Sequence, residues 1–171
     1  PRAGGVITVR FVLLALLPLI AIFLQSTFFA SYSIKGVVPD LVLVFIIFYA
    51  LLNGAEKGAR YGLICGLLED LYIGQFIGMN ALSKAATAYI IGRLQHRVFT
   101  ENVAVGVISV IVGSMINALM LLVLAWAYFA AFNIGPGFFI NVLYQIIYNV
   151  LLTTPIYIWF YQSSRRGLLK E

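Results

Sequence analysis

Long apolar runs separated by short polar connections dominate this sequence. Six runs are candidates for membrane-spanning helices, because a helix needs about 20 largely apolar residues to cross about 30 Å of hydrocarbon. The runs lie near residues 9–30, 38–53, 58–76, 78–95, 102–131 and 138–162. They are continuous rather than alternating, which favours helices over the strands of a transmembrane barrel. We therefore predict an all-α integral membrane protein, with residues 1–171 forming a single polytopic domain and a bundle of six transmembrane helices.

The second run is the weakest of the six. Its apolar part, from Leu41 to Leu52, has only 12 residues. Pro39 and Asp40 are typical of a helix start, and Asn53-Gly54 is typical of a helix end. A buried half-span is therefore an alternative to a complete crossing at this place.

Basic residues are divided unevenly between the two sides that six spans create. The first run lacks a clear small-residue cleavage site, so we expect it to be retained as a span. The side with both termini then carries nine bases: Arg2, Arg10, Lys57, Arg60, Arg93, Arg97, Arg165, Arg166 and Lys170. The opposite side has only Lys35, and Lys84 lies inside a span. By the positive-inside rule, both termini are predicted to be cytoplasmic.

The composition excludes a water-soluble monomer. Of the 171 residues, 63% are hydrophobic and only 10% are charged, whereas about 45–50% apolar residues are usual in soluble domains. The net charge of +5 comes from bases at the ends of apolar runs, so it indicates topology rather than nucleic-acid binding. A single cysteine, Cys65, excludes both an intrachain disulfide and a cysteine metal site.

Small residues form a stripe along the third run. Gly58, Gly62 and Gly66 recur every four residues, a spacing that lets another helix approach the backbone closely. The same step continues to Asp70 and Gly74, so we expect Asp70 to face protein rather than lipid. A carboxylate at this depth is costly unless it is paired, protonated or hydrated.

Lys84 in the fourth run is the predicted partner of Asp70. The two residues are equally distant from the middle of a tight hairpin that turns between Gly74 and Gly78. We therefore hypothesise an ion pair between Asp70 and Lys84, the alternative being that the hairpin opens to the exterior and each charge is solvated separately. Glu69 is about 100° from Asp70 around the helix, which directs it to a cavity or to another subunit.

A polar stripe runs along the sixth run. Asn141, Gln145, Asn149 and Thr153 recur at steps of four, and Asn117 in the fifth run is placed to join them. Such residues need an interior environment in a membrane protein. The functional interpretation is a polar pocket or a docking groove for a foreign helix, and the structural alternative is hydrogen bonding between helices.

Little in the sequence indicates catalysis. The only histidine, His96, lies beside Arg97 in a cytoplasmic connection, and no second histidine is present to form a zinc-peptidase motif. A phosphate-binding loop and a Gly-x-Ser-x-Gly nucleophile motif are also absent. The adjacent Glu69 and Asp70 diverge on a helix, which is a poor geometry for a metal site. We therefore expect no enzyme activity, no cofactor and no metal.

Short motifs between Gly62 and Leu94 match a known family. The third run ends in Leu-x-Asp-Leu, a turn with two glycines follows, and Ala-Tyr precedes a basic end (Leu68, Asp70, Leu71, Gly74, Gly78, Ala88 and Tyr89). Gln25 at the end of the first span and Val38-Pro39-Asp40 before the second also match. Together these motifs resemble the MreD family of bacterial rod shape-determining membrane proteins, although Lys84 is not part of the family pattern.

The resemblance implies a non-catalytic scaffold of the cell-elongation complex in the bacterial inner membrane. Such proteins bind the single-span protein MreC and, through it, the MreB filament and the peptidoglycan synthases PBP2 and RodA. The glycine stripe would then be the surface that packs against partner helices, and self-association into a homo-oligomer is a further option.

Two other functions stay open from the sequence. The MreD family is similar in fold to the six-helix substrate-binding subunits of energy-coupling-factor vitamin transporters, so a solute-binding membrane subunit is the alternative. A lone helical assembly factor for an unrelated complex is the third reading, and it needs no pocket.

Overall fold

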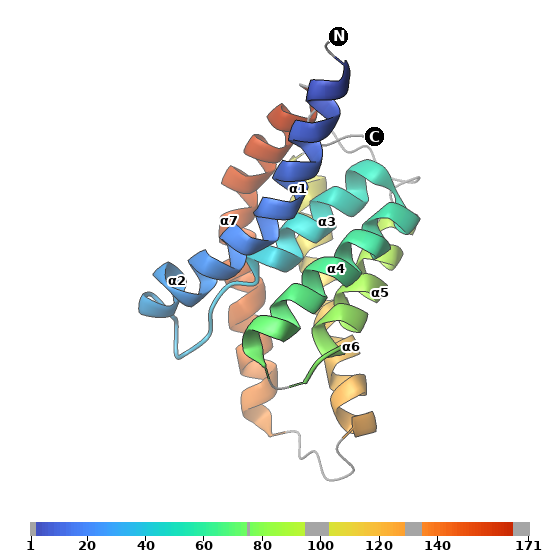
Figure 1. The fold of residues 1–171 in the computed structure, drawn as a ribbon. Helices are drawn as coiled ribbons and strands as arrows, with labels where there is room; N and C mark the ends of the chain where they lie inside the picture. Colours follow the sequence, from blue (N-terminus) through green and yellow to red (C-terminus); the bar gives the residue numbers. More distant parts are fainter. Residues whose placement is uncertain (1–2, 75, 95–102, 129–134, 166–171) are drawn as a thin grey trace.

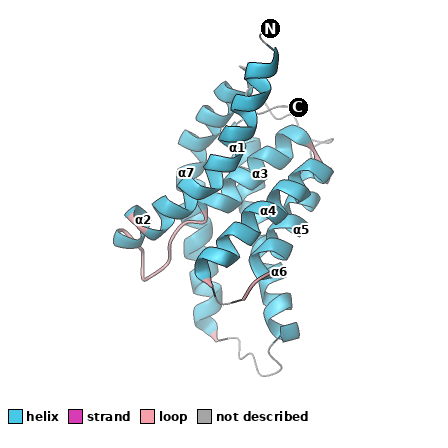
Figure 2. Ribbon diagram, in the orientation of Figure 1, coloured by secondary structure: helices cyan, strands magenta, loops and turns pink. Residues whose placement is uncertain are grey.

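Helices make up all the regular structure in the described part of the chain. The structure, a computed structural model, describes residues 3–74, 76–94, 103–128 and 135–165. Its helices are α1 (Ala3–Ser26), α2 (Phe28–Ser31), α3 (Leu41–Asn53), α4 (Ala55–Ile73), α5 (Met79–Leu94), α6 (Val103–Tyr128) and α7 (Pro136–Arg165). Figures 1 and 2 show the long helices running alternately in opposite directions, so that α1 begins and α7 ends at the same end of the molecule. The all-α prediction is therefore confirmed for the described residues.

The first predicted run is two helices rather than one. α1 ends at Ser26, and the short α2 follows it after the single residue Thr27 (Figure 1). The carbonyl of Phe23 accepts hydrogen bonds from both the backbone N–H group of Thr27 at 3.0 Å and its hydroxyl at 2.6 Å.

Several positions used for the predicted orientation lie outside the described residues. These are Arg2, Arg97, Arg166 and Lys170. His96, residue 95 and the predicted span ends at 102 and 129–131 also lie outside the described residues. The side chains of Arg10 and Arg165 are likewise not described. α4 begins and α5 ends at the same end of the molecule as the start of α1 (Figure 1).

α3 is the central helix of the structure. It contacts α1, α4, α5, α6 and α7, and side chains on all its faces are buried, among them Val44, Ile46 and Ile47 at 0% exposure. With 13 residues, α3 is about 20 Å long, which is less than the about 30 Å of a hydrocarbon layer. It starts inside the molecule, above the lower ends of α6 and α7 in Figure 1.

Length and composition alone identify three segments able to cross a membrane among the described residues. They are Val12–Ser31, Val103–Tyr128 and Pro136–Phe160. α3 is apolar but short, α5 has 16 residues, and α4 carries five charged residues along its length. Crossing by α3, α4 and α5, which the prediction of six spans requires, therefore stays a prediction.

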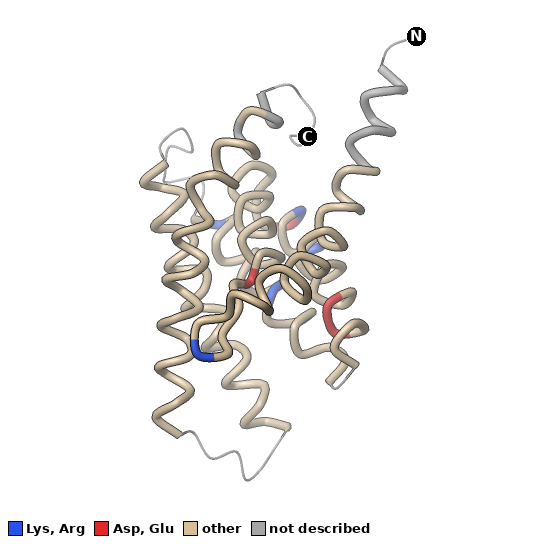
Figure 3. Tube along the Cα trace, turned by 90° about the vertical axis from the view of Figure 1, so that its left-hand side faces the viewer, with Lys and Arg blue, Asp and Glu red and all other residues tan. Residues whose placement is uncertain are grey.

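Charged residues are concentrated on a few elements. α6 has none, and α7 has only Arg165 at its last position. In the described part of the chain, Figure 3 shows basic and acidic positions in the middle of the molecule and toward the end where α1 begins. The charges inside the molecule therefore come from α4, α5 and the start of α3.

Close contact between α4 and α5 depends on glycine. A Cβ atom at Gly66 would lie 2.5 Å from the carbonyl oxygen of Asn80, and one at Gly62 would lie 2.8 Å from that of Lys84. Gly58 faces α3 instead, where a Cβ would lie 2.5 Å from the Cβ of Ala50. The glycine stripe of α4 therefore lies against protein backbone, as the spacing of the three glycines predicts.

Two glycines shape the turn between α4 and α5 instead of packing helices. Gly74 and Gly78 have φ angles of 72° and 104°, and no atom lies within 4 Å of a Cβ built at either position. These backbone conformations strongly favour glycine because it has no Cβ. The continuation of the packing stripe to Gly74 and Gly78 is thus not found, since the helix ends before both.

A Gly66→Ala substitution tests the close approach of α4 and α5. The new methyl group would meet the backbone of α5, which cannot move aside as a side chain can, and such overpacking costs typically about 1–3 kcal/mol. We expect a lower midpoint of thermal denaturation, measured by size-exclusion chromatography of the heated protein in a mild detergent.

Gly137→Ala is the matched control for this substitution. No atom lies within 4 Å of a Cβ at Gly137 in α7, so alanine should be neutral or slightly stabilising. Equal midpoints for the two variants would contradict a glycine-dependent contact between α4 and α5.

Candidate functional site

An ionic cluster lies at the junction of α3, α4 and α5. The Nζ atom of Lys84 is 2.8 Å from Oδ2 of Asp40 and 2.7 Å from Oε2 of Glu69. The exposed fractions of Lys84, Asp40 and Glu69 are only 1%, 5% and 8%. Buried charges are costly unless they are paired, so this cluster ties the start of α3 to both helices of the α4–α5 hairpin.

Asp70 does not belong to the ionic cluster, and the predicted ion pair between Asp70 and Lys84 is wrong. The carboxylate of Asp70 instead accepts hydrogen bonds from the backbone N–H groups of Gly78, Asn80 and Ala81 at 2.9–3.1 Å. The side-chain amide of Asn80 donates a further hydrogen bond to it at 3.0 Å. Asp70 thus caps the start of α5.

The different partners of Asp70 and Glu69 have a simple physical origin. The first N–H groups of a helix have no partner within the helix, and the helix dipole favours a negative charge beside them. Asp70 is near the end of α4 and its short side chain satisfies these groups in α5. Glu69 projects in a different direction around α4, and its longer side chain reaches Lys84.

The start of α3 is satisfied by three polar side chains. Oδ1 of Asp40 accepts a hydrogen bond from the N–H group of Leu43 at 2.8 Å, so one carboxylate both caps α3 and pairs with Lys84. Gln25 of α1 accepts from the N–H group of Val42 at 3.3 Å. Asn149 of α7 accepts from the N–H group of Asp40 at 2.8 Å. α1, α3 and α7 therefore meet at this point.

Buried amides and hydroxyls extend the polar contacts to α6. The amide of Asn149 donates to Oγ of Ser114 at 3.0 Å, which joins α7 to α6. Oγ of Ser83 donates to Oδ1 of Asn117 at 3.0 Å, which joins α5 to α6. Thr153 donates to the carbonyl of Asn149 within α7. Asn149 and Thr153, two residues of the predicted polar stripe, therefore form hydrogen bonds between and within helices.

The other two residues of that stripe, Asn141 and Gln145, line cavities. Gln145 is half-buried and lines a polar cavity of about 280 Å³ that also contains Asp40 and Glu69 in its wall. Asn141 is exposed and lines a neighbouring cavity of about 310 Å³. The two interpretations of the stripe, hydrogen bonding and a polar pocket, thus apply to different residues of α7.

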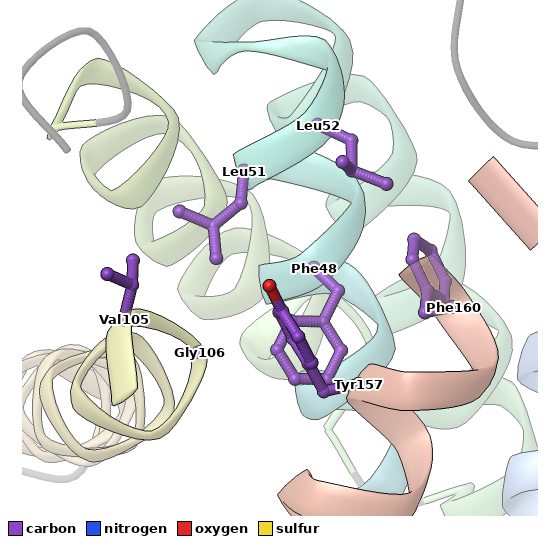
Figure 4. Close-up of a pocket in the computed structure, with 7 residues that line it drawn as sticks. All are labelled: Phe48, Leu51, Leu52, Val105, Gly106, Tyr157 and Phe160. Carbon is purple, nitrogen blue, oxygen red and sulfur yellow. The ribbon is translucent and has the colours of Figure 1, made fainter. Parts of the chain in front are cut away.

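A third cavity lies among α3, α6 and α7 but is small and apolar. Figure 4 shows its walls, which come from Phe48, Leu51, Leu52, Val105, Gly106, Tyr157 and Phe160. Its volume is about 20 Å³, close to the space that one water molecule needs. With an apolar wall and so small a volume, it is a packing gap rather than a ligand site.

The sequence assigned Asp40 to the start of a helix and to a motif of the family resemblance, but not to an ion pair. Its position gave one further signal, because an acid directly before a completely apolar run is at risk of burial. Ser83, Ser114 and Gln25 carried no such signal, since single small hydroxyls and a terminal glutamine are common on helix surfaces. Their roles depend on which helices are neighbours.

The sequence as a whole resembles a known protein family. Residues 6–166 match the protein-family model described as MreD, rod shape-determining protein MreD. No curated protein and no solved structure matches the chain significantly. The predicted similarity in fold to substrate-binding subunits of energy-coupling-factor transporters therefore stays a prediction.

Lys84→Met tests the ionic cluster. The substitution removes the cation from Asp40 and Glu69, and breaking a buried ion pair in this way typically costs about 3–5 kcal/mol. We expect loss of folded protein, measured as the yield of monodisperse material and its thermal midpoint. Replacing both acids as well (Asp40→Asn, Glu69→Gln) should recover part of the loss, because no unpaired charge remains.

Lys35→Met is the control for that experiment. Lys35 is exposed, and its Nζ atom lies 5.3 Å from the centre of the Tyr144 ring. Loss of such an exposed contact costs at most about 1 kcal/mol. If Lys84→Met and Lys35→Met were tolerated equally, the ionic cluster would not stabilise the fold.

Asp70→Asn tests the cap of α5. An asparagine amide turns an NH₂ group toward backbone N–H donors, so at least one donor is left unsatisfied, at a cost of about 1–3 kcal/mol. The thermal midpoint should fall, whereas it should hardly change for Glu56→Gln, an exposed acid in the first turn of α4. A stable Asp70→Asn variant would argue against the cap.

Proposed function

The chain belongs to the MreD family of rod shape-determining proteins, since the family model covers residues 6–166, and from this premise we propose that it is a non-catalytic scaffold of the bacterial cell-elongation complex. Family membership gives the protein a role in determining rod shape. In the proposed arrangement it crosses the inner membrane six times, both termini are cytoplasmic, and it binds an MreC-like single-span protein. Through that partner it would be linked to MreB, PBP2 and RodA.

The observation that carries this proposal is a rigid α4–α5 hairpin with an exposed apolar outer face. The inner face is held by glycine contacts, by the cap from Asp70 and by the ionic cluster. The outer face of α4 exposes Leu63, Ile64, Leu67, Leu71 and Tyr72, between 41% and 61% each. A fixed apolar surface suits packing against another helix, because little order has to be gained on binding.

The composition of the hairpin also favours a protein neighbour. α4 carries charged residues at both ends of its apolar stretch, and α5 is short. Neither helix is among the segments whose length and composition suit a lipid environment by themselves. A partner helix against α4 would cover its apolar outer face.

Isolation of the full chain from its native membrane tests the proposal. A tagged chain is extracted in mild detergent, and the proteins that accompany it are identified by mass spectrometry. We expect a single-span MreC-like protein together with cell-wall synthases. Recovery of an ATPase module with a small molecule, and no single-span partner, would favour the transporter subunit instead.

Bulky substitutions locate the partner on the surface. Ile64→Trp on α4 should lower recovery of the single-span protein about fivefold or more, because the larger ring separates two closely packed helices. Leu119→Trp on α6 is the matched control, since Leu119 is 54% exposed and Ile64 is 59% exposed. Loss of the partner only in the Leu119 variant would move the proposed contact from α4 to α6.

A further inference from the structure

The polar cavity beside the ionic cluster has an unusual wall. Its volume is about 280 Å³, close to the lower end of the about 300–1,000 Å³ typical of small-ligand sites. Besides Tyr72, seven polar side chains contribute to it: Gln25, Ser26, Asp40, Glu69, Asn80, Asn117 and Gln145. They come from α1, the start of α3, α4, α5, α6 and α7. A cavity whose polar groups converge from this many elements differs from a simple packing gap.

The cavity reaches from the surface of the protein to its interior. At one end Tyr72 and Ile73 are 61% and 49% exposed, and at the other end Asp40 and Asn117 are 5% and 3% exposed. A second cavity of about 310 Å³ shares Val38, Leu121 and Gln145 with it. This second cavity includes the exposed Gly36 and Asn141 in its wall. The two cavities therefore adjoin on the side of the α2–α3 connection.

The charge on the cavity wall is negative. Asp40 and Glu69 line the cavity, but Lys84, which pairs with both, does not. The cation thus lies behind the two carboxylates, and two acids against one base leave one negative charge in excess. The described residues that line the cavity include no basic side chain. An anion entering this space would be repelled, whereas a cation would be attracted.

We propose that this cavity is a binding site for a small organic cation, a solute that carries a protonated amine on a short apolar chain. The ammonium group has three N–H donors, which suit the carboxylate and amide oxygens at the inner end. The apolar part of the solute lies against Ile73 and Leu121, beside the ring of Tyr72. This inference goes beyond the scaffold function and does not depend on it.

Protection of an introduced cysteine tests the proposal. Gln145→Cys places a thiol in the wall shared by the two cavities, and its modification by N-ethylmaleimide is followed by mass spectrometry on the full chain in a non-ionic detergent. The native Cys65 is only 1% exposed. The chain without the Gln145→Cys substitution gives the background modification of Cys65. The probes are n-butylammonium, n-butanol and butyrate, which share a chain length and differ in charge.

We expect n-butylammonium to slow modification at position 145 at least fivefold in a saturable manner, while n-butanol and butyrate have no such effect. Lys35→Cys, on the exposed connection outside the cavity, should show no protection. Equal effects of the three probes, or no protection by any of them, would overturn the proposal.

Two further variants separate binding from folding. Glu69→Gln, in the Gln145→Cys chain, should abolish protection by n-butylammonium, and the thermal midpoint reports whether this variant is folded. Asn141→Lys adds a positive charge in the wall of the neighbouring cavity without touching the ionic cluster. It should raise the concentration of n-butylammonium needed for half-maximal protection about tenfold. Asn141→Gln is its matched control and should leave protection unchanged. Full protection in the Asn141→Lys variant would contradict an electrostatic site for cations.

Discussion

A helix that starts inside an apolar molecule must find partners there for its first N–H groups. α3 has this problem because it is short and central, and its start lies away from the ends of the molecule. Asp40 solves part of it by capping α3, but the cap brings a negative charge into the interior. Lys84 balances that charge, and the resulting ion pair fixes α3 to α5.

The ionic cluster depends in turn on the close approach of α4 and α5. Gly62 lies directly against the carbonyl of Lys84, so a side chain at this position would push the lysine away from α4. With the backbones close together, Glu69 reaches Lys84 at 2.7 Å. The cap from Asp70 then fixes the start of α5 relative to the end of α4. Steric and electrostatic contacts in the hairpin therefore support one another.

The same arrangement connects the rigid part of the molecule with the surfaces assigned to function. Satisfied polar groups inside the bundle specify one packing of the helices, and the apolar outer face of α4 is held in position for a partner. Asp40 and Glu69, which both pair with Lys84, also line the polar cavity. The position of the outer face of α4 and the negative charge of the polar cavity thus both depend on the ionic cluster.

The sequence by itself determined the features that depend on neighbours along the chain. Apolar runs predicted the helices, Asp40 and Gly54 bounded α3, and the four-residue glycine spacing identified the packed face of α4. The family resemblance was also carried by short local motifs, and the family match agrees with it. Each of these depends on a helical repeat or on a turn that a few residues define.

Only the tertiary structure decided the partners of the buried charges. Counting residues placed Asp70 and Lys84 at similar depths, but depth does not give the rotation of one helix relative to the next. Lys84 pairs with Asp40 across 44 positions of the sequence, and Asn149 binds the backbone of Asp40 across 109 positions. Such contacts depend on which helices become neighbours, and that is decided by the packing of the whole chain.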